Sequence, residues 1–156
     1  MPNVTALVAA VAISLSATVA TACNLPPNAA SLMADAGSAL NAARTDNGRD
    51  ALRRDARLDR AAQRHACWMS TNGSFSHRGA GNSGPRDRIA ATGYQASMTS
   101  ENIAEGQPSG QQVMSDWMRS QGHRDNILRG EAKDYGVGVA LLSGRVLWVM
   151  LYAAQR

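Results

Sequence analysis

The chain has 156 residues and carries 16 Lys and Arg against 12 Asp and Glu, which gives a net charge of +4. This length suits one domain with one core. The basic residues are spread along the chain, only 4% of residues are aromatic, and no base-reading motif is present, all of which argues against a nucleic-acid partner.

Residues 5–22 form an uncharged, mostly apolar run that ends in "ATA", the small-x-small pattern that signal peptidases recognise. No Lys or Arg precedes the run. A membrane anchor needs about 20 strongly apolar residues, whereas this run is short and diluted by Ser and Thr. We therefore expect a signal peptide over 1–22, a short segment over 23–31, a secreted or periplasmic protein, and no integral membrane span in the mature chain.

The two cysteines, Cys23 and Cys67, predict a disulfide in an exported chain. Cys67 falls opposite the apolar face of its predicted helix. Packing in the hydrophobic core therefore does not explain a cysteine at this position. The alternative is lipidation of Cys23 and anchoring as a lipoprotein. It fits less well, because a lipobox prefers Leu three places before the cysteine and Ala20 stands there.

Four helices are predicted from apolar residues at helical spacing, in the order of the chain. The first begins near Leu32 and ends at "DNG"; the second covers about 56–71 and ends at "TNG". A short third helix begins at Pro85. The fourth contains Trp117, and Gly122 is expected to end it and to present His123 at that stop.

In the C-terminal region the apolar residues alternate instead of following helical spacing, and β-branched and apolar residues are frequent. It reads "YGVGVALLSGRVLWVMLYAAQ", and "SG" marks a turn between two strands of a hairpin. Helices come first and strands last, without βαβ alternation. The pattern predicts an α+β fold in which helices pack on an antiparallel sheet.

Two of the three histidines, His77 and His123, are expected outside apolar faces, whereas His65 lies on the core face of the second helix and is interpreted as a structural residue. Glu101 in "SENIA" must face a cleft or a partner, because an unpaired buried carboxylate is costly. His77, His123 and Glu101 could bind Zn²⁺ with one position open for water, although their spacing is not that of a local ligand motif. No nucleophile elbow, H-E-x-x-H helix or phosphate loop is present.

The chain resembles the CAP superfamily of cysteine-rich secretory, antigen 5 and pathogenesis-related proteins, in its bacterial SCP-domain branch. The resemblance covers about 32–153 and rests on matching segments that occur in the family's order. These are "NAAR", "LDRAAQRHACWM", "FSHRG", "PRDRIAATGY", "ENIAEG", "DWMRSQGHRDNIL" and "YGVGVA". It implies an α-β-α sandwich with a central antiparallel sheet, including an earlier strand or strands that the residue patterns alone do not predict.

The resemblance also implies a cleft of two histidines and two acidic residues. His77, Glu101 and His123 match the family's pattern, and Asp87 is the nearest candidate for the fourth position, where glutamate is common. Arg124, Asp125 and Asn126 are interpreted as capping and turn residues.

Three functions remain open from the sequence. The leading hypothesis is a secreted, monomeric binding domain whose cleft takes a divalent cation, such as Zn²⁺, or a small polar or lipid-like ligand, with a lipid, glycan or protein of the envelope as partner. The alternative is a zinc-dependent extracellular hydrolase, peptidase-like, in which His77 and His123 hold the metal and Glu101 is the general base. In the third, the cleft residues only brace the fold and charge attracts the protein to the envelope.

Overall fold

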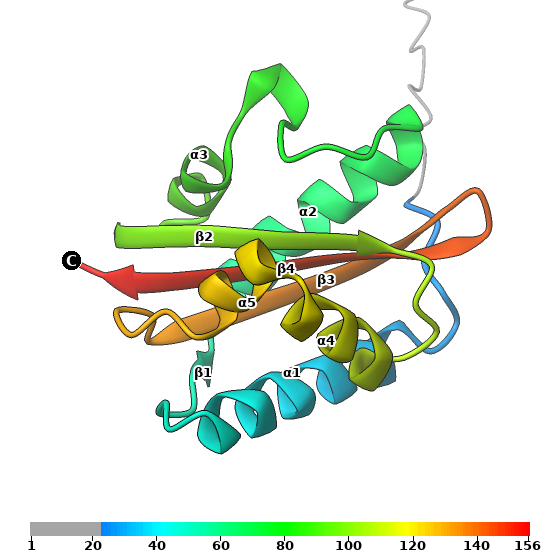
Figure 1. Ribbon diagram of the computed structural model, residues 1–156. Coiled ribbons are helices and arrows are strands. Elements are labelled where there is room, and N and C mark those ends of the chain that lie inside the picture. The colour runs from blue at the N-terminus through cyan, green and yellow to red at the C-terminus, as the bar shows by residue number, and fades with distance from the viewer. Residues whose placement is uncertain (1–22) are drawn as a thin grey trace, which may run out of the picture.

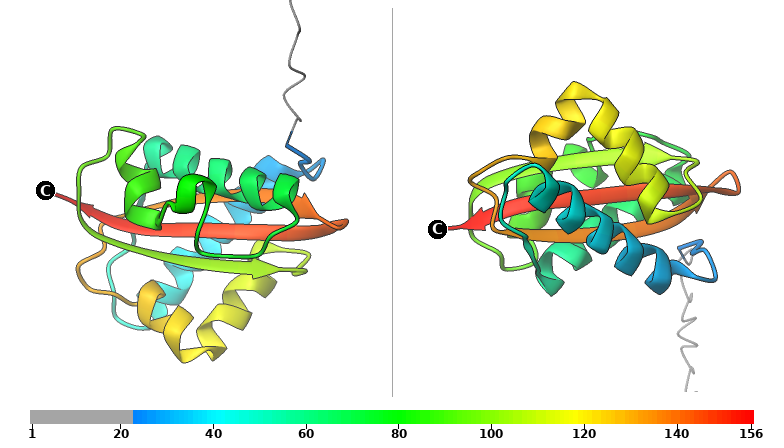
Figure 2. Two further views of the ribbon diagram at one scale, coloured as in Figure 1. Left: turned by 90° about the horizontal axis from the view of Figure 1, so that it is seen from above. Right: turned by 60° about the horizontal axis from the view of Figure 1, so that its bottom comes forward.

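The computed structural model describes residues 23–156, and the expected signal peptide lies outside them. A four-stranded sheet separates two layers of helices (Figures 1 and 2). The α-helices are α1 (Ala29–Asp46), α2 (Ala56–Asn72), α3 (Pro85–Ala90), α4 (Gly110–Arg119) and α5 (Gln121–Ile127). The strands are β1 (Arg53–Arg54), β2 (Ala96–Glu105), β3 (Asp134–Leu142) and β4 (Arg145–Gln155), and η1 (Ala80–Asn82) is a short 3₁₀ helix.

The sheet has the strand order β1-β3-β4-β2, and its three long strands are antiparallel. The predicted hairpin is confirmed as β3 and β4, which turn at Ser143 and Gly144, both with positive φ. β2 is the earlier strand that the residue patterns did not predict. The two-residue β1 pairs with β3 in parallel, so the sheet is antiparallel apart from this short addition.

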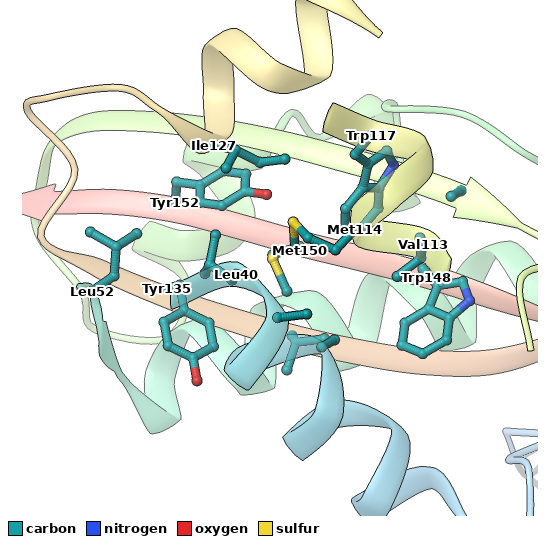
Figure 3. Close-up of a cluster of buried hydrophobic side chains, with 14 of the residues drawn as sticks. Leu40, Leu52, Val113, Met114, Trp117, Ile127, Tyr135, Trp148, Met150 and Tyr152 are labelled. Atoms are coloured by element: carbon teal, nitrogen blue, oxygen red, sulfur yellow. The ribbon is translucent and has the colours of Figure 1, made fainter. Parts of the chain in front are cut away.

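The helices lie on both faces of the sheet, which confirms the α-β-α sandwich (Figure 2). On one face, α1, α4 and α5 cover a core that includes Trp117, Met150 and Tyr152 (Figure 3). On the other face, α2 and α3 cover a second core that includes Met69 and Leu151. Because both faces are covered, β4 is buried almost continuously rather than at alternate residues.

The second predicted helix is confirmed as α2. Asp55 caps its start by accepting the backbone N–H of Arg57, and Gly73 ends it with a φ of 59°. The helix lies unusually close to β3. A Cβ added at Gly136 would stand 2.2 Å from the backbone of Leu58, so the absence of a side chain there allows this approach.

The fourth predicted helix is two helices, and the prediction that Gly122 ends it was wrong. Ser120 is extended, with φ −98° and ψ 118°, and it ends α4 and begins α5. Its carbonyl accepts the backbone N–H of Arg124 at 2.8 Å, so a serine in an N-cap position restarts the helix. His123 therefore lies within α5 and not at a helix stop.

The predicted disulfide between Cys23 and Cys67 is confirmed, with Cα atoms 5.0 Å apart. Beside it, the backbone N–H of Leu141 donates to the carbonyl oxygen of Asn24 at 2.7 Å. The chain before α1 is thus fastened both to α2 and to the end of β3.

No helix within residues 23–156 is long and apolar enough to cross a membrane.

Candidate functional site

Edge strand β2 carries two adjacent buried polar residues, Glu101 and Asn102, which are 6% and 0% exposed. Glu101 pairs with Leu151, and Asn102 pairs with Met150. Directly opposed residues share one face of a sheet, so Glu101 lies on the side of α2 and α3, and Asn102 on the side of α4 and α5. The strand therefore offers polar groups to both helical layers.

Glu101 is held by two charged or chargeable partners. The Nδ1 of His77 lies 2.8 Å from its Oε1, and the Nη2 of Arg88 lies 2.5 Å from its Oε2. The side chains of Glu101 and Arg88 are 1% and 9% exposed, whereas that of His77 is 56% exposed. The expectation that this carboxylate would face a partner is confirmed, and the arrangement presents His77 to solvent on a buried support.

Arg88 is the residue of this site that the sequence did not reveal. It comes from α3 and also donates through Nη1 to the carbonyl oxygens of Ser83 at 2.7 Å and His77 at 3.1 Å. It therefore orients both the carboxylate and the backbone of the loop that carries His77. The only sequence signal was an arginine one position after a suspected site residue.

Asp87, the candidate fourth cleft residue, lies at the start of α3. Its Oδ2 accepts the backbone N–H of Gly84 at 2.8 Å, which is an N-terminal capping contact. Within the part of the chain that the structure describes, none of its hydrogen bonds reaches His77, Glu101 or His123. The structure thus brings His77 and Glu101 together and places Asp87 in a capping contact.

His123 approaches the same edge of the sheet from α5. Its Nδ1 lies 3.0 Å from the Oγ of Ser120, and its carbonyl oxygen accepts the side-chain amide of Asn102 at 3.1 Å. Asn126, one turn later, donates to the Oδ1 of Asn102 at 2.9 Å. Two amide contacts therefore fix α5 to β2, and Ser120 is a second site residue that the sequence did not reveal.

The surroundings of His123 disfavour its protonated form. The pKa of His123 is lowered from its ordinary value, first by burial and second by repulsion from His77 whenever that ring is protonated. Glu101 only accepts hydrogen bonds, so the proton of a neutral His77 ring is on Nδ1 and its Nε2 is left with a free lone pair. Because the His77 side chain is 56% exposed, this Nε2 is available to a ligand.

The three-residue zinc set expected from His77, Glu101 and His123 is not assembled as a ligand cluster. Among residues 23–156, no group of three or more His, Cys, Asp or Glu side chains is arranged to hold a metal ion. Glu101 directs its two oxygens to His77 and Arg88 instead. A cation at this edge would have to be held by imidazole nitrogens, with the carboxylate behind one of them.

His65 is buried in the α2 core, as expected of a structural residue. It is 1% exposed, its Nε2 lies 2.8 Å from the carbonyl oxygen of Ser76, and its ring stacks on Trp68 with centroids 6.0 Å apart. Since a carbonyl only accepts, Nε2 carries the ring proton. Burial lowers the pKa of His65 more than the charge of Glu101 raises it.

We expect His65 to make the domain less stable as the pH falls below about 6.5, the ordinary pKa that the unfolded chain adopts. Between that value and the lowered pKa of the folded state, the unfolded chain binds a proton that the folded chain does not. The free energy of unfolding then falls by at most about 1.4 kcal/mol per pH unit. Chemical denaturation between pH 8 and pH 5 measures it, and His65→Gln should flatten the profile; an equal slope in that variant would contradict the assignment.

The comparisons with known proteins agree on one family. The model of the cysteine-rich secretory protein family (CAP) matches residues 38–152. The uncharacterized protein YkwD of Bacillus subtilis (strain 168) is 34% identical over 98 residues, which are 63% of this chain and 38% of that protein. The chain thus spans well under half the length of that relative.

Solved structures that share the fold include the following two. An extracellular protein of Bacillus anthracis (strain Ames) that contains an SCP domain has a TM-score of 0.76 at 23% identity, over 86% of this chain and 45% of that one. An outer surface protein of Borrelia burgdorferi has a TM-score of 0.71 at 19% identity, over 77% of this chain and 90% of that one. Since the family model covers most of the sandwich, from within α1 to within β4, this chain belongs to the cysteine-rich secretory protein (CAP) family.

Proposed function

We propose that this chain is an exported CAP domain of the cell envelope or extracellular space, and that it binds a divalent transition-metal cation through the Nε2 atoms of His77 and His123. The observation that carries the proposal is the contact between the buried Glu101 and the Nδ1 of His77. A carboxylate behind a histidine fixes the tautomer and makes the other ring nitrogen a better metal ligand.

Export is supported by three features. The apolar run over 5–22 ends in a signal-peptidase pattern. The chain forms a disulfide, which persists in oxidising compartments. The similar proteins of Bacillus anthracis and Borrelia burgdorferi are described as extracellular and as an outer surface protein. Mass spectrometry of the exported protein should give a chain beginning at Cys23; a retained Met1 or a diacylglyceryl mass on Cys23 would contradict the proposal.

Cation binding fits the site in two respects. Imidazole is a common ligand for Zn²⁺, and a neutral ring is required. The Nδ1 of His77 is directed to Glu101, and the lowered pKa of His123 favours its neutral ring. With two protein ligands, the remaining positions of the cation are open to water or to an envelope ligand.

Binding is favoured over hydrolysis by the state of Glu101. As a general base, it would need a water molecule at a side chain that is 1% exposed, and each of its oxygens already has a hydrogen-bond partner. The carboxylate is better placed to orient His77 than to take a proton from a substrate water. This argument supports a binding domain over the zinc hydrolase.

We expect calorimetric titration with Zn²⁺ at pH 7.5 to show one saturable site that the double variant His77→Ala, His123→Ala weakens at least tenfold. The matched control is Arg78→Ala, Arg124→Ala, which removes an exposed neighbour of each histidine and should bind Zn²⁺ at least as well, because two positive charges are lost. Equal affinities in the wild type and the histidine variant would overturn the proposal.

A further inference from the structure

A pocket of about 170 Å³ lies behind the loop that carries His77, between α2, η1 and α3. Figure 2 (left) shows the loop and α3 beside α2, on the face of the sheet opposite α4 and α5. The pocket is distinct from the histidine pair, because neither His77 nor His123 lines it. An apolar cavity of about 150 Å³ is large enough for benzene, so this pocket has room for a ring-sized molecule.

The walls of the pocket are mostly apolar and carry positive but no negative charge. Ala61 and Trp68 of α2 and Ala91 beside α3 supply apolar surface, and Arg64 and Arg88 supply two guanidinium groups. No Asp or Glu is among the lining residues. The lining therefore suits a ligand with an apolar body and an anionic group.

The two arginines differ in how their charge is compensated. Arg88 is paired with Glu101, whose carboxylate would also repel an anion. Arg64 is exposed and makes no ion pair with any residue between 23 and 156. Arg64 is consequently the group that would balance the charge of a bound anion.

Two buried polar atoms of the lining residues also lack a partner. The Nε of Arg88 and the Nδ1 of His65 make no hydrogen bond with the residues that the structure describes. A buried donor without a partner is destabilising, and a ligand oxygen could accept a hydrogen bond from the Nε–H of Arg88. Trp68 is only half-buried and adds an aromatic surface for a ring.

We propose that this pocket binds a ring-sized organic monocarboxylate, with its apolar body against Ala61 and Trp68 and its carboxylate facing Arg64. The proposal adds a second site to the domain and does not depend on cation binding. The two sites share Arg88, which lines the pocket and holds Glu101 behind His77. A ligand in the pocket should therefore also change the environment of His77.

Benzoate and its neutral counterpart benzamide provide the test, because they have the same size and differ in charge. Each is titrated into the oxidised protein in the presence of EDTA and followed by two-dimensional NMR. Benzoate should shift the Trp68 indole N–H and the amides of α2 and α3 in a saturable manner. Benzamide should bind at least tenfold more weakly. No saturable shift with benzoate, or shifts confined to other parts of the domain, would overturn the proposal.

Two variants and one control separate the pocket from nonspecific binding. Arg64→Gln should weaken benzoate at least tenfold and leave benzamide unchanged, while Ala91→Leu should block both, because position 91 lines the pocket and is exposed. Arg60→Gln, an exposed arginine one turn earlier in α2 that does not line the pocket, should bind benzoate like the wild type. Equal affinity for benzoate in Arg64→Gln and the wild type would contradict the proposal. If Ala91→Leu fails to fold, the two ligands and Arg64→Gln still decide the result.

Discussion

Removal of the Cys23–Cys67 disulfide is expected to lower the free energy of unfolding by about 2–4 kcal/mol. The cysteines are 44 residues apart, and closing a loop of that length in the unfolded chain corresponds to about 4 kcal/mol in the chain-entropy model. The whole of α1 lies in this loop. Without the crosslink, the segment around Asn24 is still tied to β3 by its backbone hydrogen bond with Leu141, but it loses its covalent link to α2.

The double variant Cys23→Ala, Cys67→Ala and the reduced wild type should show the same decrease in the free energy of unfolding, measured by urea denaturation. A reducing agent should then have no further effect on the variant, which is the matched control for the chemistry of the reductant. Since small domains have about 5–15 kcal/mol of stability, the variant should still fold. A variant as stable as the oxidised wild type would show that the crosslink does not constrain the unfolded chain.

The elements that the sequence predicted are those with a strong periodic or turn signal. α2 has apolar residues on one face, an Asp55 cap and a terminal Gly73, and the hairpin has two apolar runs around a serine–glycine turn. β2 has neither kind of signal. Its sequence "ASMTSENIAE" contains only two β-branched residues, and it is a strand because nine of its residues pair with β4.

Helix ends were less predictable than helices. Gly122 looked like a stop because glycine commonly follows the last turn of a helix. A Cβ at this position would meet nothing within 4 Å, so the backbone does not require glycine there. The break lies instead at Ser120, whose extended backbone ends α4 and precedes the first residue of α5.

The site residues that match the family's sequence pattern could be predicted. Those whose position depends on tertiary packing could not. His77, Glu101 and His123 were expected together, and the contact of His77 with Glu101 is present. Arg88 could not be inferred, because one residue along a helix changes direction by about 100° and selects a different partner. Asp87 and Arg88 are adjacent, yet one caps the helix and the other reaches the carboxylate.

Replacing Arg88 by methionine is expected to lower the free energy of unfolding by about 3–5 kcal/mol, the usual cost of removing one partner from a buried ion pair. The methionine keeps much of the apolar volume but leaves Glu101, with a side chain that is 1% exposed, without its guanidinium partner. It also removes the donors to the carbonyl oxygens of Ser83 and His77. Urea denaturation of Arg88→Met at pH 7 measures the loss.

A double-mutant cycle with Glu101→Leu separates the ion pair from the packing of the two side chains. The double variant Arg88→Met, Glu101→Leu leaves neither charge buried. Its free energy of unfolding should therefore fall by about 1–3 kcal/mol less than the sum of the decreases in the two single variants. The control pair joins Arg145 of β4 to Glu105 of the edge strand β2, but its atoms are 3.6 Å apart and the arginine side chain is 62% exposed. Its coupling should be below about 1 kcal/mol, as for other surface pairs.

If the decreases in the free energy of unfolding are additive for the Arg88 and Glu101 variants, each side chain stabilises the domain through its own packing. The carboxylate could then not be regarded as held by Arg88, and the support of His77 would rest on Glu101 alone. A strong coupling has the opposite consequence, because Arg88 then fixes the group that orients the histidine. The same measurement therefore tests the stability of the buried pair and the basis on which His77 is presented as a ligand.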